Sequence, residues 1–154
     1  MSSTDDVIAT AAEAMTELTP EQSWGLLVGE SFGRLAYRLI EEVHVVPVNY
    51  AVEGARLLIR TAAGGKLFGA ALGTDAALEI DWHDEGDAWS VVARGRLRRL
   101  EEDEVAEADP AVGLPWVSTP KNEIIELLPE EVTGRRFRLH RPGPGRSPGR
   151  PHLA

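Results

Sequence analysis

The stretch VHVVPVNYAVEGARLLIRTAAGGKL, residues 43–67, decides the fold of this 154-residue chain. It predicts a strand that contains Pro47, then a tight turn at Glu53-Gly54 and a strand over 55–61. A glycine-rich corner of small residues then leads into Lys66. Two short strands and a basic turn within so short a span favour a cofactor site on a β scaffold.

The segments on both sides of this stretch predict further short strands. Leu35, Tyr37 and Leu39 alternate with other residues, which is the period of a strand, and Glu41-Glu42 is the expected turn that follows it. Gly95 predicts a bend or bulge in a long strand. Strands are predicted over 33–40, 44–52, 55–61, 75–84 and 88–100, and the last ones over 122–141, broken near Pro129 and Gly134. This pattern predicts a mainly β protein with short helices, built as a small antiparallel barrel.

Helical signals lie before and between the strands. Residues 5–17 have a thin apolar stripe that predicts a short helix. Thr19 is the expected N-cap of the next helix, and Gln22 completes a capping box. A third short helix is predicted over 66–72, capped by Gly73. The predicted organisation is an N-terminal helical arm (1–17), a barrel domain (18–140) and a disordered Pro/Gly/Arg tail (141–154).

Composition excludes several classes of protein. The chain has no cysteine, so disulfides and thiolate metal sites are absent. Its net charge of −9 argues against a nucleic-acid binder, because a phosphate backbone requires a basic face. No apolar run is long enough to span a membrane, and the N-terminus lacks the pattern of a signal peptide. We therefore expect a cytoplasmic protein of one main domain.

Pro47 marks the first candidate site. Proline cannot donate a hydrogen bond to a strand ladder, so a proline within a strand indicates an edge or a gap in pairing. The backbone groups of Val46, Val48 and Asn49 would then be available to the edge of a flat heterocycle. An ordinary edge strand is the simpler interpretation of Pro47 taken alone, and both interpretations stay open here.

The corner Arg60–Lys66 is the second candidate site. Arg60 offers a planar fork of donors, Thr61 offers a hydroxyl, and Lys66 adds a positive charge beside two glycines. Glycines let backbone amides approach an anion, and a following helix N-terminus favours negative charge. The pattern is that of a site for a single phosphate and lacks the spacing of a nucleotide P-loop. A solvent-facing loop is the alternative.

Other polar and aromatic residues carry weaker signals. Trp89 and Ser90 lie in a predicted strand, where a tryptophan belongs either to the core or to a stacking surface. The histidines do not have the spacing of metal ligands, so no metal site is predicted. The chain also has no nucleophile elbow, so hydrolytic chemistry has no support. The four histidines are His44, His83, His140 and His152.

Five motifs in a fixed order resemble the pyridoxamine 5′-phosphate oxidase-like family. They are GRLA (33–36), VVPVNY (45–50), IRTAAGGKL (59–67), EIDWHDEGDAWSVVARG (79–95) and PEEVTGRRF (129–137). The resemblance covers about Leu18 to Phe137 and is closest to a small bacterial branch that includes nitroimidazole-resistance-type proteins. It implies a six-stranded antiparallel split β-barrel of the FMN-binding type.

The resemblance also implies a cofactor and an assembly. FMN would bind at the interface of a homodimer, with deazaflavin or haem as the alternatives found in the same branch. The ring would lie along Val46, Pro47, Val48 and Asn49. The phosphate would be held by Arg60, Thr61, Lys66 and Leu67. Trp89 and Ser90 would lie near the flavin or the dimer seam.

Two functions follow as hypotheses. The first is a flavin-dependent oxidoreductase that passes hydride to or from the flavin N5, with an unknown small-molecule substrate and electron donor. The second is a non-catalytic module that binds, stores or senses the cofactor. The sequence identifies no catalytic residue for either. A split-barrel dimer that has lost its cofactor is a third alternative.

Overall fold

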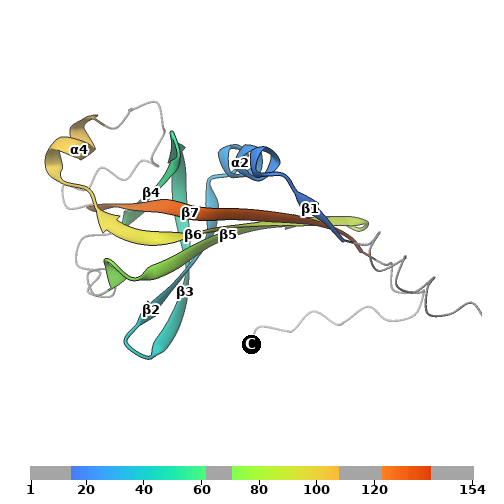
Figure 1. The fold of residues 1–154 in the computed structure, drawn as a ribbon, viewed down its shortest axis with the longest axis horizontal. Coiled ribbons are helices and arrows are strands. Elements are labelled where there is room, and N and C mark those ends of the chain that lie inside the picture. The colour runs from blue at the N-terminus through green and yellow to red at the C-terminus, as the bar shows by residue number, and fades with distance from the viewer. Residues whose placement is uncertain (1–14, 62–70, 108–122, 140–154) are drawn as a thin grey trace, which may run out of the picture.

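The computed structural model describes residues 15–61, 71–107 and 123–139 (Figure 1). Most of them lie in strands. In chain order the elements are β1 (Met15–Leu18), α2 (Pro20–Gly29), β2 (Phe32–Leu39), β3 (Glu42–Glu53), β4 (Arg56–Thr61), β5 (Asp75–His83), β6 (Asp87–Arg99), α4 (Glu102–Glu107) and β7 (Glu123–Arg138).

Among the described residues, seven antiparallel strands form one sheet that closes on itself. The order is β1-β7-β4-β3-β2-β5-β6, and β6 also pairs with β7. Six strands therefore form a ring, and β1 is added along the free part of β7. The strand β7 is long enough to pair with β4 near its start and with β1 near its end (Figure 1). The prediction of a mainly β, six-stranded antiparallel split barrel is confirmed.

The two hairpins that flank β3 turn in different ways. Gly54 has a φ of 59°, as expected of the glycine in the turn between β3 and β4. The turn between β2 and β3 was predicted one residue too late, because Glu42 already pairs with Leu39 and begins β3. The turn residues are therefore Ile40 and Glu41. Ile40 has a φ of 58°, a conformation that costs an L-residue roughly 1–2 kcal/mol.

The predicted bulge at Gly95 is present, whereas the predicted breaks in the last strand are absent. The register between β6 and β7 shifts at Arg94/Gly95, and a Cβ on Gly95 would lie 2.1 Å from the carbonyl oxygen of Leu128. Because Pro129 opposes Gly95 at this bulge, the proline does not interrupt the strand. Gly134 continues β7, and a Cβ there would lie 2.4 Å from the Ser23 hydroxyl. Because Gly134 has no side chain, α2 can lie close to the sheet at this point.

The helix α2 begins where the sequence predicts. The Thr19 side chain accepts a hydrogen bond from the Gln22 amide at 3.2 Å, and the Thr19 amide donates to the Gln22 side chain at 2.9 Å. The helix ends at Gly29 and packs over the end of the barrel that β1 and β7 form. The hydroxyl of Tyr50 in β3 donates to the carbonyl of Leu27 at 2.7 Å and fixes the C-terminal end of α2.

The helix predicted over 5–17 is wrong at its C-terminal end. Met15 to Glu17 belong to β1, which pairs with β7 from Met15↔Phe137 to Leu18↔Gly134. Strand pairing with a distant segment outweighs the weak local helical pattern. Residues 5–14, and residues 66–70 of the helix predicted before Gly73, lie outside the described residues. Gly73 itself has a φ of 78°, as expected of a left-handed cap.

The barrel interior holds one apolar core. Its members alternate along the strands with outward residues, which is why the period of two in the sequence predicted them. The largest side chains that are almost completely buried are Tyr37, Tyr50, Leu27, Leu35, Leu57, Leu58, Ile59, Leu78, Ile80, Leu97, Ile125 and Leu127. All of these except Leu58 join a single cluster; Leu58 packs with Leu100 and Ile124 in a second, smaller one.

Candidate functional site

The barrel opens where β3 and β4 separate. These strands pair only from Tyr50↔Ile59 to Glu53↔Arg56, although β3 begins eight residues earlier, at Glu42. Over Val46–Asn49 one edge of β3 pairs with β2, and the other edge has no strand partner among the described residues. The interruption in pairing that Pro47 predicts therefore exists, and it leaves backbone donors and acceptors along an open edge.

Arg60 lies at this same opening. Asn49 and Arg60 are the first residues beyond the last pair, Tyr50↔Ile59, on their respective strands. Since Tyr50 and Ile59 point into the core, Asn49 and Arg60 point to the outside of the barrel. Asn49 is exposed and Arg60 is half-buried. The structure thus brings the segment predicted for the ring next to the first residue predicted for the phosphate.

The rest of the predicted phosphate segment is only partly described. Thr61 ends β4 and pairs with Glu123 of β7, so it follows Arg60 along the opening. Lys66 and Leu67 lie outside the described residues. The glycine corner between them and Thr61 does as well.

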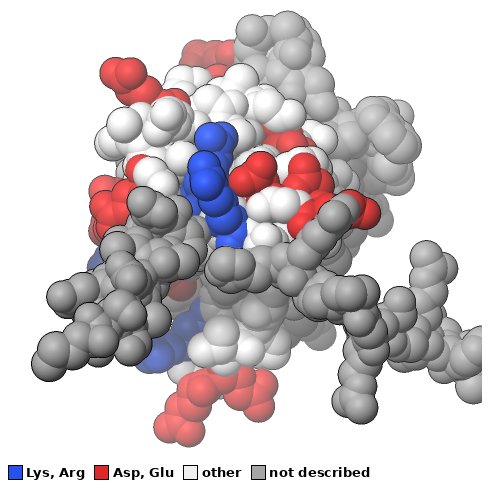
Figure 2. Space-filling view, turned by 90° about the vertical axis from the view of Figure 1, so that its right-hand side faces the viewer, with Lys and Arg blue, Asp and Glu red and all other residues white. Residues whose placement is uncertain are grey.

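The structure does not bring Trp89 and Ser90 to this opening within one chain. They pair with Arg136 and Arg135 near the end of β7, whereas Arg60 pairs with Ile124 near its start. Figure 1 shows β7 running nearly straight between these two ends. Figure 2 views the molecule from the side on which β7 ends. It shows basic side chains in one stripe beside acidic ones. Trp89 is half-buried and packs against the core.

A charged cluster missed by sequence reasoning lies on the outer face beside Pro47. Arg34, the β2 residue opposite Pro47, donates to Glu79 of β5 at 2.9 and 3.1 Å and also contacts Asp81. Burial and the neighbouring Asp81 raise the pKa of Glu79 above its usual range. A hydrogen bond with Glu79, followed by the charge of Arg34, lowers the pKa of Asp81. The cluster holds a guanidinium rigidly one strand away from the open edge.

A second ionic network holds β4, β6, β7 and α4 together. The carboxylate of Glu126 accepts from Arg56 at 2.8 Å and from Arg98 at 3.3 Å, and Arg98 also donates to Glu104 at 2.8 and 2.7 Å. Burial acts to raise the pKa of Glu126, but the hydrogen bonds from the two arginines outweigh it and the pKa is lowered. The network fixes the strands from which Arg60 extends.

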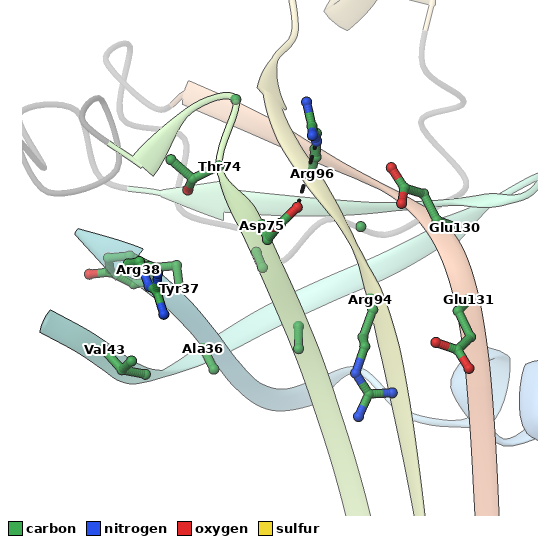
Figure 3. Close-up of a pocket in the computed structure, with 14 residues that line it drawn as sticks. Ala36, Tyr37, Arg38, Val43, Thr74, Asp75, Arg94, Arg96, Glu130 and Glu131 are labelled. Atoms are coloured by element: carbon green, nitrogen blue, oxygen red, sulfur yellow. Dashed lines mark ion pairs between the residues drawn. The ribbon is translucent and has the colours of Figure 1, made fainter. Parts of the chain in front are cut away.

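A large hollow lies on the outer face of β2, β5, β6 and β7 (Figure 3). Its volume is about 720 Å³, within the range of small-molecule pockets. Small side chains form its floor, since Ala36 and Ala77 face each other across β2 and β5. The charged side chains around it are Arg38, Asp75, Arg94, Arg96, Glu130 and Glu131. This hollow was not predicted from the sequence.

Two further features concern metals and membranes. Within residues 15–61, 71–107 and 123–139, no group of three or more His, Asp or Glu side chains has the arrangement of a metal site. No helix in these ranges is long and apolar enough to cross a membrane.

Comparison with known proteins identifies the family. The family model described as pyridoxamine 5′-phosphate oxidase matches residues 19–136, so the chain belongs to this family. The predicted membership is therefore confirmed, and the fold is that of the flavin-binding split barrels.

Individual relatives agree with this membership. An uncharacterized protein of Mycobacterium tuberculosis is 42% identical over 97 residues, which are 62% of this chain and 87% of the relative. The solved structure of the FAD binding protein from Mycobacterium smegmatis has 38% identity and a TM-score of 0.73, covering 81% of this chain and all of the other. A candidate 5-nitroimidazole antibiotic resistance protein from Bacteroides thetaiotaomicron, at 12% identity and TM-score 0.64, shares the fold over 81% of this chain and 90% of its own.

Proposed function

We propose that this protein binds a flavin at the opening between β3 and β4 and uses it as an oxidoreductase. The observation that carries the proposal is the position of Asn49 and Arg60, which follow the last β3–β4 pair on either side of the opening. The unpaired edge over Val46–Asn49 offers amide and carbonyl groups to the rim of a heterocycle. Arg60, at the end of that edge, offers a guanidinium to a phosphate.

The chain's own residues would position the flavin rather than carry out the chemistry. A bound flavin supplies hydride transfer at its N5, and the protein's part is orientation and electrostatics. Val46, Pro47, Val48 and Asn49 would align the ring. Arg60 and Thr61, with Lys66 and Leu67, would hold the phosphate. FMN is the form that we propose; the FAD-binding relative at 38% identity makes FAD the form to compare with it.

We also infer that two copies of the chain complete each site. If Trp89 and Ser90 contact the same flavin as Arg60, they must come from a second copy, because one chain holds them at opposite ends of β7. A homodimer with two symmetry-related flavin sites at its interface satisfies this requirement. Trp89 would then serve the core of its own chain while Ser90 faces the neighbouring flavin.

The first experiment is a titration of the apo-protein with FMN and with FAD, followed by flavin fluorescence. We expect binding in the micromolar range or tighter, with one flavin per chain. Absence of binding for both flavins would contradict the proposal. Deazaflavin and haem would then be tested in the same way, as the alternatives that the family resemblance suggests.

A second experiment separates the catalytic function from the non-catalytic one. The flavin-loaded protein is mixed with NADH or NADPH in a stopped-flow instrument, and bleaching of the flavin absorbance is recorded. Reduction within seconds supports an oxidoreductase. A tightly held flavin that neither nucleotide reduces would instead favour a module that stores or senses the cofactor.

A further inference from the structure

The tip of the β2–β3 hairpin has the most unusual backbone among the described residues. Ile40 is the only non-glycine residue in these ranges with a positive φ, at 58°. Two-residue hairpin loops normally place glycine, asparagine or aspartate in this conformation, because a β-branched side chain is strained there. The folding of a single chain therefore gives no reason for isoleucine at this position.

The same tip exposes a run of apolar side chains. Ile40 is 89% exposed, Val43 67% and Val45 61%. Val43 and Val45 lie on one face of β3, since side chains two residues apart in a strand point the same way. Figure 1 shows that the hairpin projects from the barrel. Single exposed apolar residues are ordinary, but a cluster on a projecting hairpin is typical of an interaction surface.

A hollow that can accept the hairpin tip of a second copy lies on the same outer face. The hollow of about 720 Å³ has a floor of small residues, with Ala36 paired to Ala77 and Ala77 paired to Arg94. Because alanine has only a methyl side chain, the pair Ala36↔Ala77 leaves the floor of the hollow low. Val43 and Arg38 belong both to the hairpin and to the wall of the hollow (Figure 3).

The charges of the tip and the hollow are complementary. The tip carries Glu41 and Glu42, and the hollow carries Arg94 and Arg96. Within one chain Glu42 lies 3.4 Å from His44, and Arg96 pairs with Asp75 at 3.6 Å, so Glu41 and Arg94 are the charges of the two sets without an ion pair among the described residues. On the opposite wall are Glu130 and Glu131, whereas the hairpin contributes Arg38. Within the part of the chain that the structure describes, no hydrogen bond or ion pair involves the side chain of Glu41, Arg38, Glu130 or Glu131. These charges are available to a partner.

We propose that the β2–β3 hairpin is the element through which two copies of this chain associate, with Ile40 of each copy entering the outer-face hollow of the other. Because tip and hollow are adjacent on one face, a two-fold axis beside them brings each tip over the other hollow. The acidic tip then meets Arg94 and Arg96. This inference rests on the homodimer of the proposed function and identifies the surface through which its two copies would make contact.

The substitution Ile40→Gly tests this directly, because strain and association respond in opposite directions. Glycine relieves the left-handed backbone, so the thermal stability of the dilute chain should not fall. It also removes the anchor. We expect the dimer dissociation constant to rise about ten- to a hundredfold, which corresponds to the loss of one buried aliphatic side chain. Sedimentation over a dilution series, without flavin, measures this constant. Val28→Ala on α2 is the matched control, since Val28 is 66% exposed away from the hairpin.

A charge-reversal series tests the same contact by a route that does not depend on folding strain. Arg94→Glu with Arg96→Glu should weaken association strongly. Adding Glu41→Arg with Glu42→Arg should restore it at least in part, because the complementary signs are recovered. A reversal at the tip that leaves the weakened dimer no stronger would overturn the proposed pairing.

The results separate this inference from the proposed function. A wild-type protein that stays monomeric at every concentration, or a dimer that Ile40→Gly does not weaken, overturns the docking surface. Such a protein could still bind flavin in the titration described above. Conversely, a dimer that weakens as expected but binds no flavin supports the surface and contradicts the flavin site.

Discussion

Replacing Tyr50 by Phe should loosen α2 from β3 at the point where the barrel opens. The Tyr50 hydroxyl donates to the Leu27 carbonyl at 2.7 Å, and Tyr50 is only 1% exposed. Leu27 lies in the last turn of α2, where carbonyls have no partner within the helix. Glu30, the residue after the helix, is extended, so no glycine cap satisfies these carbonyls. Tyr50 supplies that hydrogen bond from outside the helix.

The magnitude follows from leaving this carbonyl buried without its donor. The loss should be about 1–3 kcal/mol in the free energy of unfolding. For a domain of this size that lowers the Tm by about 2–12 °C. Urea denaturation at neutral pH, followed by circular dichroism, measures the difference. The two proteins should have the same m-value, because the substitution does not change the surface exposed on unfolding.

The pH dependence provides an independent check. Burial, and then the charge of Glu30, raise the pKa of Tyr50 far above its usual value of 10.0. Below that usual value both the folded and the unfolded chain keep the proton, so Tyr50 adds no pH dependence. Above it the unfolded chain loses its proton first. The wild type then loses up to about 1.4 kcal/mol per pH unit that Tyr50→Phe does not lose. A variant as stable as the wild type at neutral pH, or a stability difference that stays constant between about pH 9 and about pH 11, would refute this account of Tyr50.

Three further predictions test the bulge, the ionic network and the opening. Gly95→Ala places a Cβ 2.1 Å from the Leu128 carbonyl oxygen, and since backbone cannot rotate away, thermal melting should show a loss of about 2 kcal/mol or more. Glu126→Gln should destabilise by about 1–3 kcal/mol at neutral pH, because it removes a buried carboxylate that accepts hydrogen bonds from two partly exposed arginines. The pKa of Glu126 is lowered, so its contribution is present above its usual pKa of 4.5 and is lost as the pH falls, and urea curves of the two proteins should converge in acid. Arg60→Ala should raise the flavin dissociation constant about ten- to a hundredfold through loss of one charge-assisted hydrogen bond, whereas Arg99→Ala, which removes an exposed charge from β6, should leave it unchanged.

The sequence predicted the barrel because its signals are local. Alternation along β2 and β5 identifies which side chains face the core, and Gly54 identifies a turn that needs a positive φ. Thr19 and Gln22 identify the start of α2 by a hydrogen-bond pattern within four residues. Each of these features depends only on neighbours in the chain, so each can be read without knowledge of the fold.

The features that were wrong or missed depend on distant segments. Met15–Leu18 is a strand because β7 pairs with it, although its own residues favour a helix. Pro129 stays within β7 because the strand bulges there at Glu130 and Gly95 of β6 leaves room for it. The cluster of Arg34 and Glu79 arises from the register between β2 and β5, which are 45 residues apart at this point. No local pattern in the sequence contains that register.

The residues of the candidate site divide in the same way, into those predicted from local signals and those that depend on distant segments. Pro47 predicted an interruption in pairing, and the β3 edge beside it has no described partner. Arg60 was predicted as a phosphate ligand from its neighbours alone, and the pair Tyr50↔Ile59 then places it beside Asn49. Trp89 and Ser90 were assigned to the same cofactor, but the register with β7 separates them from Arg60 in one chain. The prediction for these two residues therefore depends on a second copy.

The most direct test of the central claim is amide hydrogen exchange at the open edge of β3. The amide of Asn49 faces the opening, because the amides of Val46, Val48 and Tyr50 point toward β2, and it is predicted to exchange more slowly when FMN or FAD is added. Amides of Ala51–Glu53, where β3 already pairs with β4, should not change and serve as the internal control. Unchanged exchange at Asn49 in protein saturated with flavin would show that the flavin binds elsewhere and would contradict the account.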